Sequence, residues 1–81
     1  MIYLAITSEG LSQALRVAGN DDAVWCGADA ISETAWAALP APKCTRFVHE
    51  LRDLVLLDDA LGTIEEHHPG QTIWIEATSP A

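Results

Sequence analysis

The chain has 81 residues, of which 49% are apolar and 20% charged, and its formal net charge is −8. This length allows one domain with a thin core, since a chain this short buries only about 60–65% of its unfolded surface. The acidic excess repels nucleic acids and anionic membranes, so we expect neither as a direct partner. No apolar run approaches the ~18 residues of a membrane span. The start of the chain has no signal-peptide pattern, which favours a cytoplasmic protein.

The first residues predict a strand followed by a helix. Residues Ile2 to Ile6 are almost continuously apolar and compatible with a strand. Apolar residues then recur at helical spacing over 11–18. Thr7 or Ser8 can cap that helix, and Gly19 can stop it.

A second strand and helix follow after an acidic turn. The run Ala23 to Cys26 has no polar alternation, which is typical of a strand buried on both faces, so Val24 should be buried. Ser32 is a good cap for a helix that carries Trp36. Pro40-Ala41-Pro42 ends this helix.

The second half predicts two more strands before the last helix. The segment Thr45 to His49 has few large apolar residues, which favours a strand near a sheet edge. Leu54 to Leu57 is fully apolar and of strand length, so we expect a buried strand that includes Leu56. Asp58 or Asp59 can cap the helix that follows.

That last helix is expected from about Asp59 to His68, with Leu61 and Ile64 buried. Pro69-Gly70 breaks the chain, and Gln71 to Glu76 can form a final strand. Its alternation puts Ile73 and Ile75 on one face and Trp74 on the other.

These elements predict a small three-layer α/β fold with a mostly parallel sheet of four to five strands and three helices. Residues 1–77 should form a single domain, and residues 78–81 a flexible tail. The short passage between the third and fourth expected strands could instead be a hairpin.

Two cysteines are the first candidates for chemistry. Cys26 ends a strand at the carboxyl edge of the expected sheet, near Asp29, where small α/β proteins place their working groups. The surrounding carboxylates would raise the pKa of a thiol. Cys44 has cationic neighbours but lies at the start of a strand. Neither belongs to a Cys-x-x-Cys pair, and we interpret both as reduced structural thiols, with Cys26 the possible reactive one.

No metal site or catalytic set emerges elsewhere. The segment Glu65-Glu66-His67-His68 offers metal-binding residue types, but adjacent histidines on a helix point about 100° apart. Asp58-Asp59 could hold a divalent cation, although capping a helix explains the pair. No nucleophile, base and orienting group occur together. We therefore expect a protein that is not an enzyme and needs no cofactor or metal.

Aromatic and basic residues predict docking to another protein. Trp25, Trp36 and Trp74 are large for so thin a core, so at least one should be partly exposed. Trp74 is the best candidate, although it could instead cover the last helix, and Trp25 is the second. Three of the four basic residues fall at 43–52, and Arg46 and Arg52 would orient a partner.

Two segments also resemble the DsrH/TusB family of small sulfur-relay subunits. The first is Leu15-Arg16-Val17-Ala18-Gly19-Asn20-Asp21-Asp22-Ala23-Val24-Trp25-Cys26-Gly27-Ala28-Asp29-Ala30. The second is Asp58 or Asp59 followed by His68-Pro69-Gly70-Gln71-Thr72-Ile73-Trp74, and Leu39-Pro40-Ala41-Pro42 also fits. Family members usually run longer and have a histidine in the first strand, where this chain has Tyr3-Leu4-Ala5.

The resemblance implies a DsrE-like fold and a structural subunit that carries no persulfide. It would act beside DsrE/TusD-like and DsrF/TusC-like subunits in thiolation of the tRNA wobble uridine. The rival hypothesis is a small acidic inhibitor or adaptor, for example one encoded by a mobile element or phage, that blocks a basic surface of a host protein. The net charge of −8 and the lack of a catalytic set motivate it.

Overall fold

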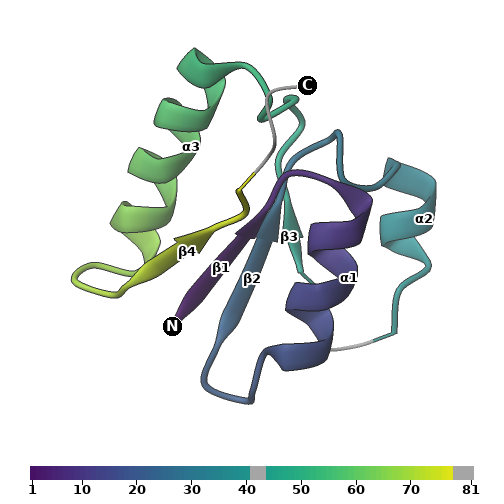
Figure 1. Ribbon diagram of the computed structural model, residues 1–81, viewed down its shortest axis with the longest axis horizontal. Coiled ribbons are helices and arrows are strands. Elements are labelled where there is room, and N and C mark those ends of the chain that lie inside the picture. The colour runs from purple at the N-terminus through teal and green to yellow at the C-terminus, as the bar shows by residue number, and fades with distance from the viewer. Residues whose placement is uncertain (41–43, 78–81) are drawn as a thin grey trace.

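Four parallel strands form a sheet between helices on both faces in the computed structural model, which describes residues 1–40 and 44–77 (Figure 1). The sheet order is β3-β2-β1-β4, and every paired strand is parallel to its neighbour. The strands are β1 (Ile2–Ala5), β2 (Ala23–Cys26), β3 (Thr45–Arg46) and β4 (Ile73–Ile75). The helices are α1 (Ser8–Val17), α2 (Glu33–Ala37) and α3 (Leu54–His67). The predicted fold class is confirmed. The expected tail, 78–81, lies outside the described residues.

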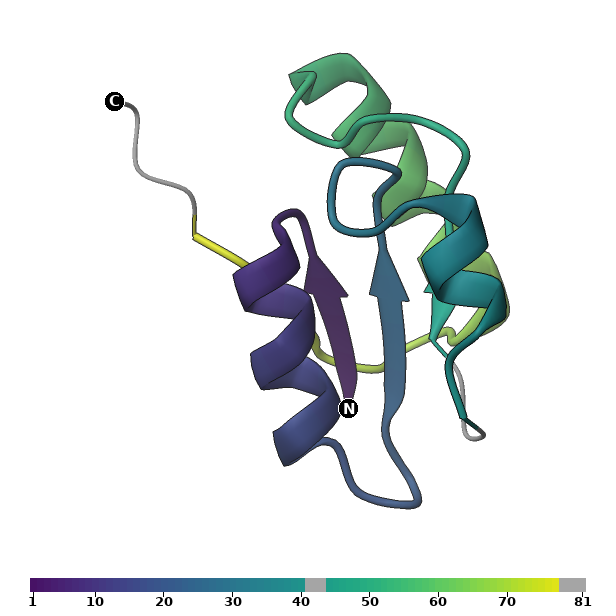
Figure 2. The same cartoon turned by 90° about the vertical axis from the view of Figure 1, so that its right-hand side faces the viewer.

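Alternating side chains of the central strands build two cores, one on each face of the sheet (Figures 1 and 2). Ile2 and Leu4 point to the face that α3 covers, where they pack with Ile64. Ala5 points to the opposite face, where Leu11 of α1 packs. This period-two alternation in a strand buried on both sides explains why β1 is apolar throughout.

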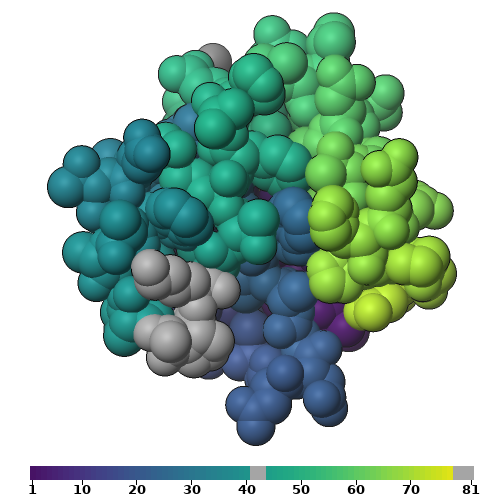
Figure 3. Space-filling view, turned by 180° about the vertical axis from the view of Figure 1, so that it is seen from behind, coloured from purple at the N-terminus to yellow at the C-terminus, as the bar shows by residue number. Residues whose placement is uncertain are grey.

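Helix α3 does not cover the whole of its face. Seen from behind, residues around β2 reach the surface between the segment after β3 and the end of α3 (Figure 3). Aromatic residues close this region: the rings of Trp25 and Phe47 have centroids 5.3 Å apart, and His67 and His68 approach Trp25 edge-on. Trp25 is buried as a result, although Phe47 is only half-buried.

Local capping chemistry sets the helix starts. Thr7 accepts a hydrogen bond from Gly10 N at α1, and Ser32 accepts one from Ala35 N at α2. Ser32 was predicted as a cap, and Thr7 was one of the two predicted candidates with Ser8, since a side-chain oxygen at this position satisfies a free N–H of the first turn. The bounds of β2 and the burial of Val24 and Ile64 are also as predicted, and Leu61 is half-buried. The short β3 lies at a sheet edge, as expected.

The predicted buried strand at Leu54 to Leu57 is wrong, because these residues form the first turn of α3. Asp53 caps the helix, and its carboxylate accepts hydrogen bonds from Val55 N and Leu56 N. The last helix therefore starts before Asp58 and Asp59, which do not cap it. An apolar run of four residues fits a helix turn as well as a strand, so periodicity alone could not separate the two. Leu56 is only half-buried.

Candidate functional site

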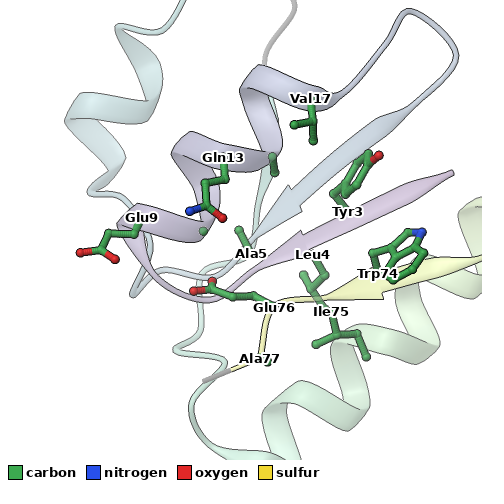
Figure 4. A pocket seen from close by; sticks show the side chains of 12 residues that line it. Tyr3, Leu4, Ala5, Glu9, Gln13, Val17, Trp74, Ile75, Glu76 and Ala77 are labelled. Carbon is green, nitrogen blue, oxygen red and sulfur yellow. The ribbon is translucent and has the colours of Figure 1, made fainter. Parts of the chain in front are cut away.

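A groove of about 510 Å³ runs between α1 and the edge strand β4 (Figure 4). Helix α1 packs over β1 and β2, so on this face of the sheet no described helix covers β4. The residues that line it include Tyr3, Gln13, Val17, Trp74, Ile75 and Glu76. We call this feature the β4 groove.

Trp74 forms one wall of the β4 groove and is 57% exposed. It lies directly opposite Tyr3 in the register of β4 with β1, so the two aromatic side chains are cross-strand neighbours on one face (Figure 4). Ile73 points to the other face and packs against the core under α3. Trp74 therefore does not cover α3, and its predicted exposure is confirmed. Ile75 is less buried than the alternation predicts, at 43% exposed.

Glu76 lies at one end of the β4 groove and binds the start of α1 (Figure 4). Its carboxylate accepts hydrogen bonds from the backbone N–H groups of Ile6 and Thr7, each at 2.7 Å, and from the Thr7 hydroxyl. A side chain at position 10 would overlap this carboxylate, so Gly10 allows the close approach. Burial alone would raise the pKa of Glu76, but these hydrogen bonds and the charge of Arg52 together lower the pKa below its usual value.

The position of Glu76 has a consequence for ligand binding. The sheet order reverses between β1 and β4, and open α/β sheets bind ligands outside the carboxyl ends of the strands at such a point. Free N–H groups at a helix start usually attract the anionic part of the ligand. Here the carboxylate of Glu76 already satisfies Ile6 N and Thr7 N. The chain thus fills this crevice with an anion of its own.

The two cysteines lie together in the core beneath α1 and α2. Both thiols are buried and reduced, with Sγ atoms 3.8 Å apart. Burial raises the pKa of Cys26 to about 12, and the neighbouring Cys44 and the charge of Asp29 add to this rise, against a smaller opposing effect of Arg46. Because the thiolate is the reactive form, this environment disfavours Cys26 as a nucleophile or persulfide carrier.

We expect both thiols of the native protein to resist alkylation. With a pKa of about 12 for Cys26, on the order of one thiol in ten thousand is ionised at pH 8. Iodoacetamide should therefore label the native protein at least about a hundredfold more slowly than the urea-unfolded protein. Mass spectrometry of time points from both samples measures the ratio. Rapid labelling of either cysteine in the folded protein would contradict the assignment of both as structural thiols.

Asp29 holds two loops together at the carboxyl edge of the sheet. Its carboxylate accepts hydrogen bonds from Leu51 N at 3.3 Å and Arg52 N at 3.1 Å. The Arg52 side chain approaches the same carboxylate, with Nε 3.8 Å away, but remains mostly exposed. The carboxylate of Asp29, in the segment after β2, is therefore occupied by structural contacts.

Two of the other residues predicted to bind a partner, Arg46 and Trp25, do not form one surface with Trp74. Arg52 is mostly exposed, and its charge acts on Glu76 at one end of the β4 groove. Arg46 belongs to β3 and Trp74 to β4, which are the opposite edges of the sheet. Arg46 Nε donates to the carbonyl of Ile31 at 2.8 Å, so its side chain links β3 to the loop before α2. Trp25 lies in the core, which corrects its prediction as a surface anchor. Lys43 lies outside the described residues.

Sequence reasoning missed a second exposed apolar region. Val48, Leu54 and Val55 are 77%, 78% and 72% exposed around the start of α3. The misassignment of Leu54 to Leu57 as a buried strand hid this region. Asp53, a residue type that often caps helices, lies directly before the apolar run. This was the signal that could have revealed the helix start and its exposed residues.

Within residues 1–40 and 44–77, no three His, Cys, Asp or Glu side chains are grouped so as to hold a metal ion. His67 and His68, which are metal-binding residue types but were not expected to bind a metal together, pack near Trp25, with ring centroids 5.5 and 5.9 Å from its own. No helix in the same part of the chain is long and apolar enough to cross a bilayer.

No family model, curated protein or solved structure matches this chain significantly. The resemblance to the DsrH/TusB family therefore stays a prediction from the sequence.

Proposed function

We propose that this protein is a non-catalytic subunit that acts by docking another protein through the β4 groove and Trp74. The observation that carries the proposal is the exposure of Trp74, at 57%, on the wall of a groove that no described helix covers. Tryptophan is enriched among the residues that dominate binding energy, because its large rigid ring loses little conformational entropy on burial.

Two features support a non-catalytic role. The pKa of Cys26 is raised by burial to about 12, which opposes thiolate chemistry. The carboxylate of Glu76 fills the crevice in which folds of this kind bind anionic ligands. A docking function requires neither a free thiol nor an open crevice.

Charge indicates the kind of partner. The chain carries a net charge of −8, and Glu9 and Glu76 both line the β4 groove. A partner surface that is basic around an apolar centre would match this groove and would be steered toward it.

The sequence resemblance suggests a cellular setting. In a cytoplasmic sulfur relay the partners would be DsrE/TusD-like and DsrF/TusC-like subunits, and the process would be thiolation of the tRNA wobble uridine. The alternative is an acidic inhibitor or adaptor that blocks a basic host surface, which the net charge of −8 favours. Deleting the gene and measuring wobble 2-thiouridine by mass spectrometry separates the two. Unchanged thiolation would rule out the relay and leave the inhibitor.

Replacing Trp74 with alanine should weaken partner binding without unfolding the protein. A central aromatic anchor contributes about 2 kcal/mol or more, which is roughly 30-fold in affinity. The partner would first be identified by co-purification of the untagged protein from its native host. Its affinity for wild type and Trp74→Ala would then be measured by calorimetry, alongside thermal melting.

Val55→Ala is the matched control, since Val55 is an exposed apolar residue like Trp74, at 72% against 57%, but lies at the start of α3. It should bind the partner like wild type. If Trp74→Ala binds normally and Val55→Ala does not, the docking surface is the α3 region and the proposal for the β4 groove is wrong. A large loss of melting temperature in Trp74→Ala would instead assign Trp74 a role in the fold.

A further inference from the structure

The outer edge of β4 is an unpaired strand edge. Strand β4 is last in the sheet order and pairs only with β1. Thr72 O accepts a hydrogen bond from Ile2 N, and Glu76 N donates to Leu4 O, each at 2.9 Å. Because successive residues of a strand direct their backbone groups to opposite sides, the backbone N–H and C=O groups of Ile73 and Ile75 point away from β1. No described residue pairs with them.

Of the features that usually protect a sheet edge, β4 has a short length of three residues. Other natural edge strands are blunted by lysine, proline or a bulge, and the described residues of β4 include neither lysine nor proline. Strand β4 reads Ile-Trp-Ile, three residues with high strand propensity, and two of them are exposed at the surface. Its three-residue length limits the number of backbone hydrogen bonds that an added strand could form, yet the neighbouring β4 groove provides further apolar surface on the side of Trp74.

We propose that the outer edge of β4 is completed by an extended, basic segment of the partner protein, which adds a fifth strand to the sheet. This inference rests on the proposed docking function and specifies how docking occurs. In strand addition, backbone hydrogen bonds give affinity, and alternate side chains of the added segment give specificity. One row of those side chains would lie beside Trp74 and the β4 groove, and the other beside Ile73 and Ile75.

Charge favours a basic partner segment over a second copy of this chain. Each copy carries a net charge of −8, so self-pairing would bring two strongly acidic molecules together. Screening acts over about 8 Å at physiological salt, which leaves repulsion at contact distance. Lysine or arginine in the added segment would instead complement this net charge.

One substitution removes an outward hydrogen-bond donor of the β4 edge and leaves the rest of the docking surface unchanged. Ile75→Pro removes the N–H that points outward, whereas Trp74 and Glu76 keep the groups directed at β1. Ile75→Val retains that N–H with a side chain close in size to proline. Thermal melting of both variants should stay near wild type, which shows that the sheet is intact.

The probe is a synthetic peptide of alternating valine and threonine with lysines at both ends, compared with the same peptide flanked by glutamates. Wild type and Ile75→Val should bind the lysine peptide, and Ile75→Pro should bind about tenfold more weakly or not at all. The glutamate peptide should bind far more weakly to all three proteins. Hydrogen exchange of wild type should show new protection at the Ile73 and Ile75 amides.

Three results would overturn strand addition: no binding of the lysine peptide to wild type, equal binding to Ile75→Pro, or a wild-type dimer that Ile75→Pro dissolves. The co-purified partner gives a separate readout for docking itself. If the partner loses affinity for Trp74→Ala but binds Ile75→Pro normally, docking through the β4 groove stands and strand addition is wrong. If the partner binds both variants normally, the docking proposal is wrong as well.

Discussion

Ile64→Ala should destabilise the protein by about 3 kcal/mol and lower its melting temperature by roughly 12–24 °C. Ile64 is fully buried in α3 and packs with Ile2 and Leu4 in the core that this helix covers. Truncation removes the transfer free energy of the buried side chain and leaves a cavity. In so small a domain, few neighbours can move to fill that cavity.

Val55→Ala in the same helix is the control. Because Val55 is mostly exposed, its truncation should change the free energy of unfolding by about 0.5 kcal/mol or less. Urea denaturation of wild type and both variants measures the differences. A large cost for Val55→Ala with a small one for Ile64→Ala would indicate that Leu54 to Leu57 are buried and that the assignment of α3 is incorrect.

Glu76→Gln should also destabilise the protein, by about 2–3 kcal/mol at neutral pH. The ionised carboxylate accepts hydrogen bonds from Ile6 N, Thr7 N and the Thr7 hydroxyl, and bonds to charged groups contribute more than neutral ones. Glutamine has a single acceptor oxygen, and its amide can meet the N–H donors with a donor of its own. Glu66→Gln, on the exposed surface of α3, should be nearly neutral.

The pH dependence gives an independent check on Glu76. Its folded-state pKa lies below the ordinary value of 4.5, so its stabilisation is fully present above pH 4.5 and is lost as the pH falls through the folded pKa. Asp22, whose pKa is also lowered, chiefly by a hydrogen bond from Gly19, contributes to the same acid slope. The informative quantity is therefore the difference between wild type and Glu76→Gln, which should shrink below pH 4.5. A constant difference across this range would contradict the role assigned to the carboxylate.

A second substitution reaches the same contact from the other side. A side chain at position 10 would overlap the Glu76 carboxylate, so Gly10→Ala should displace it and cost a similar free energy. Combining Gly10→Ala with Glu76→Gln should cost less than the sum of the two single changes, because both remove one set of hydrogen bonds. Full additivity would mean that Gly10 acts independently of Glu76.

Elements with local signals could be predicted from the sequence, and those that depend on distant contacts could not. The caps Thr7 and Ser32 and the strand Ala23–Cys26 are encoded by neighbouring residues. The apolar run at Leu54 fits both a buried strand and a helix turn by periodicity, and the local signal that separates the two is Asp53, a helix cap directly before the run. Sheet order also lies beyond periodicity, because it depends on which strands meet in space.

The candidate site shows the same division. The alternation of residues around Trp74 correctly predicted that Trp74 and Ile73 lie on opposite faces of the sheet, since strand side chains have a period of two. The β4 groove could not be predicted from the sequence, because it depends on the pairing of β4 with β1 at a position that α1 does not cover. Arg46 was predicted to bind a partner because of its charge, but its guanidinium holds a carbonyl of the loop before α2. Charge patterning in sequence does not distinguish such an internal contact from a free surface group.

The pairing of β1 with β4 sets an order for folding during synthesis. Strand β1 leaves the ribosome before the other three strands described, and its nearer partner, β2, follows after one helix. Its other neighbour and the Glu76 carboxylate come from residues about 70 positions later. A nascent chain can therefore assemble β1, α1 and β2 early, but one edge of β1 stays open until residue 76 has left the exit tunnel. During that interval Ile6 N and Thr7 N lack their acceptor, and the exposed edge is available to chaperones or to other nascent chains.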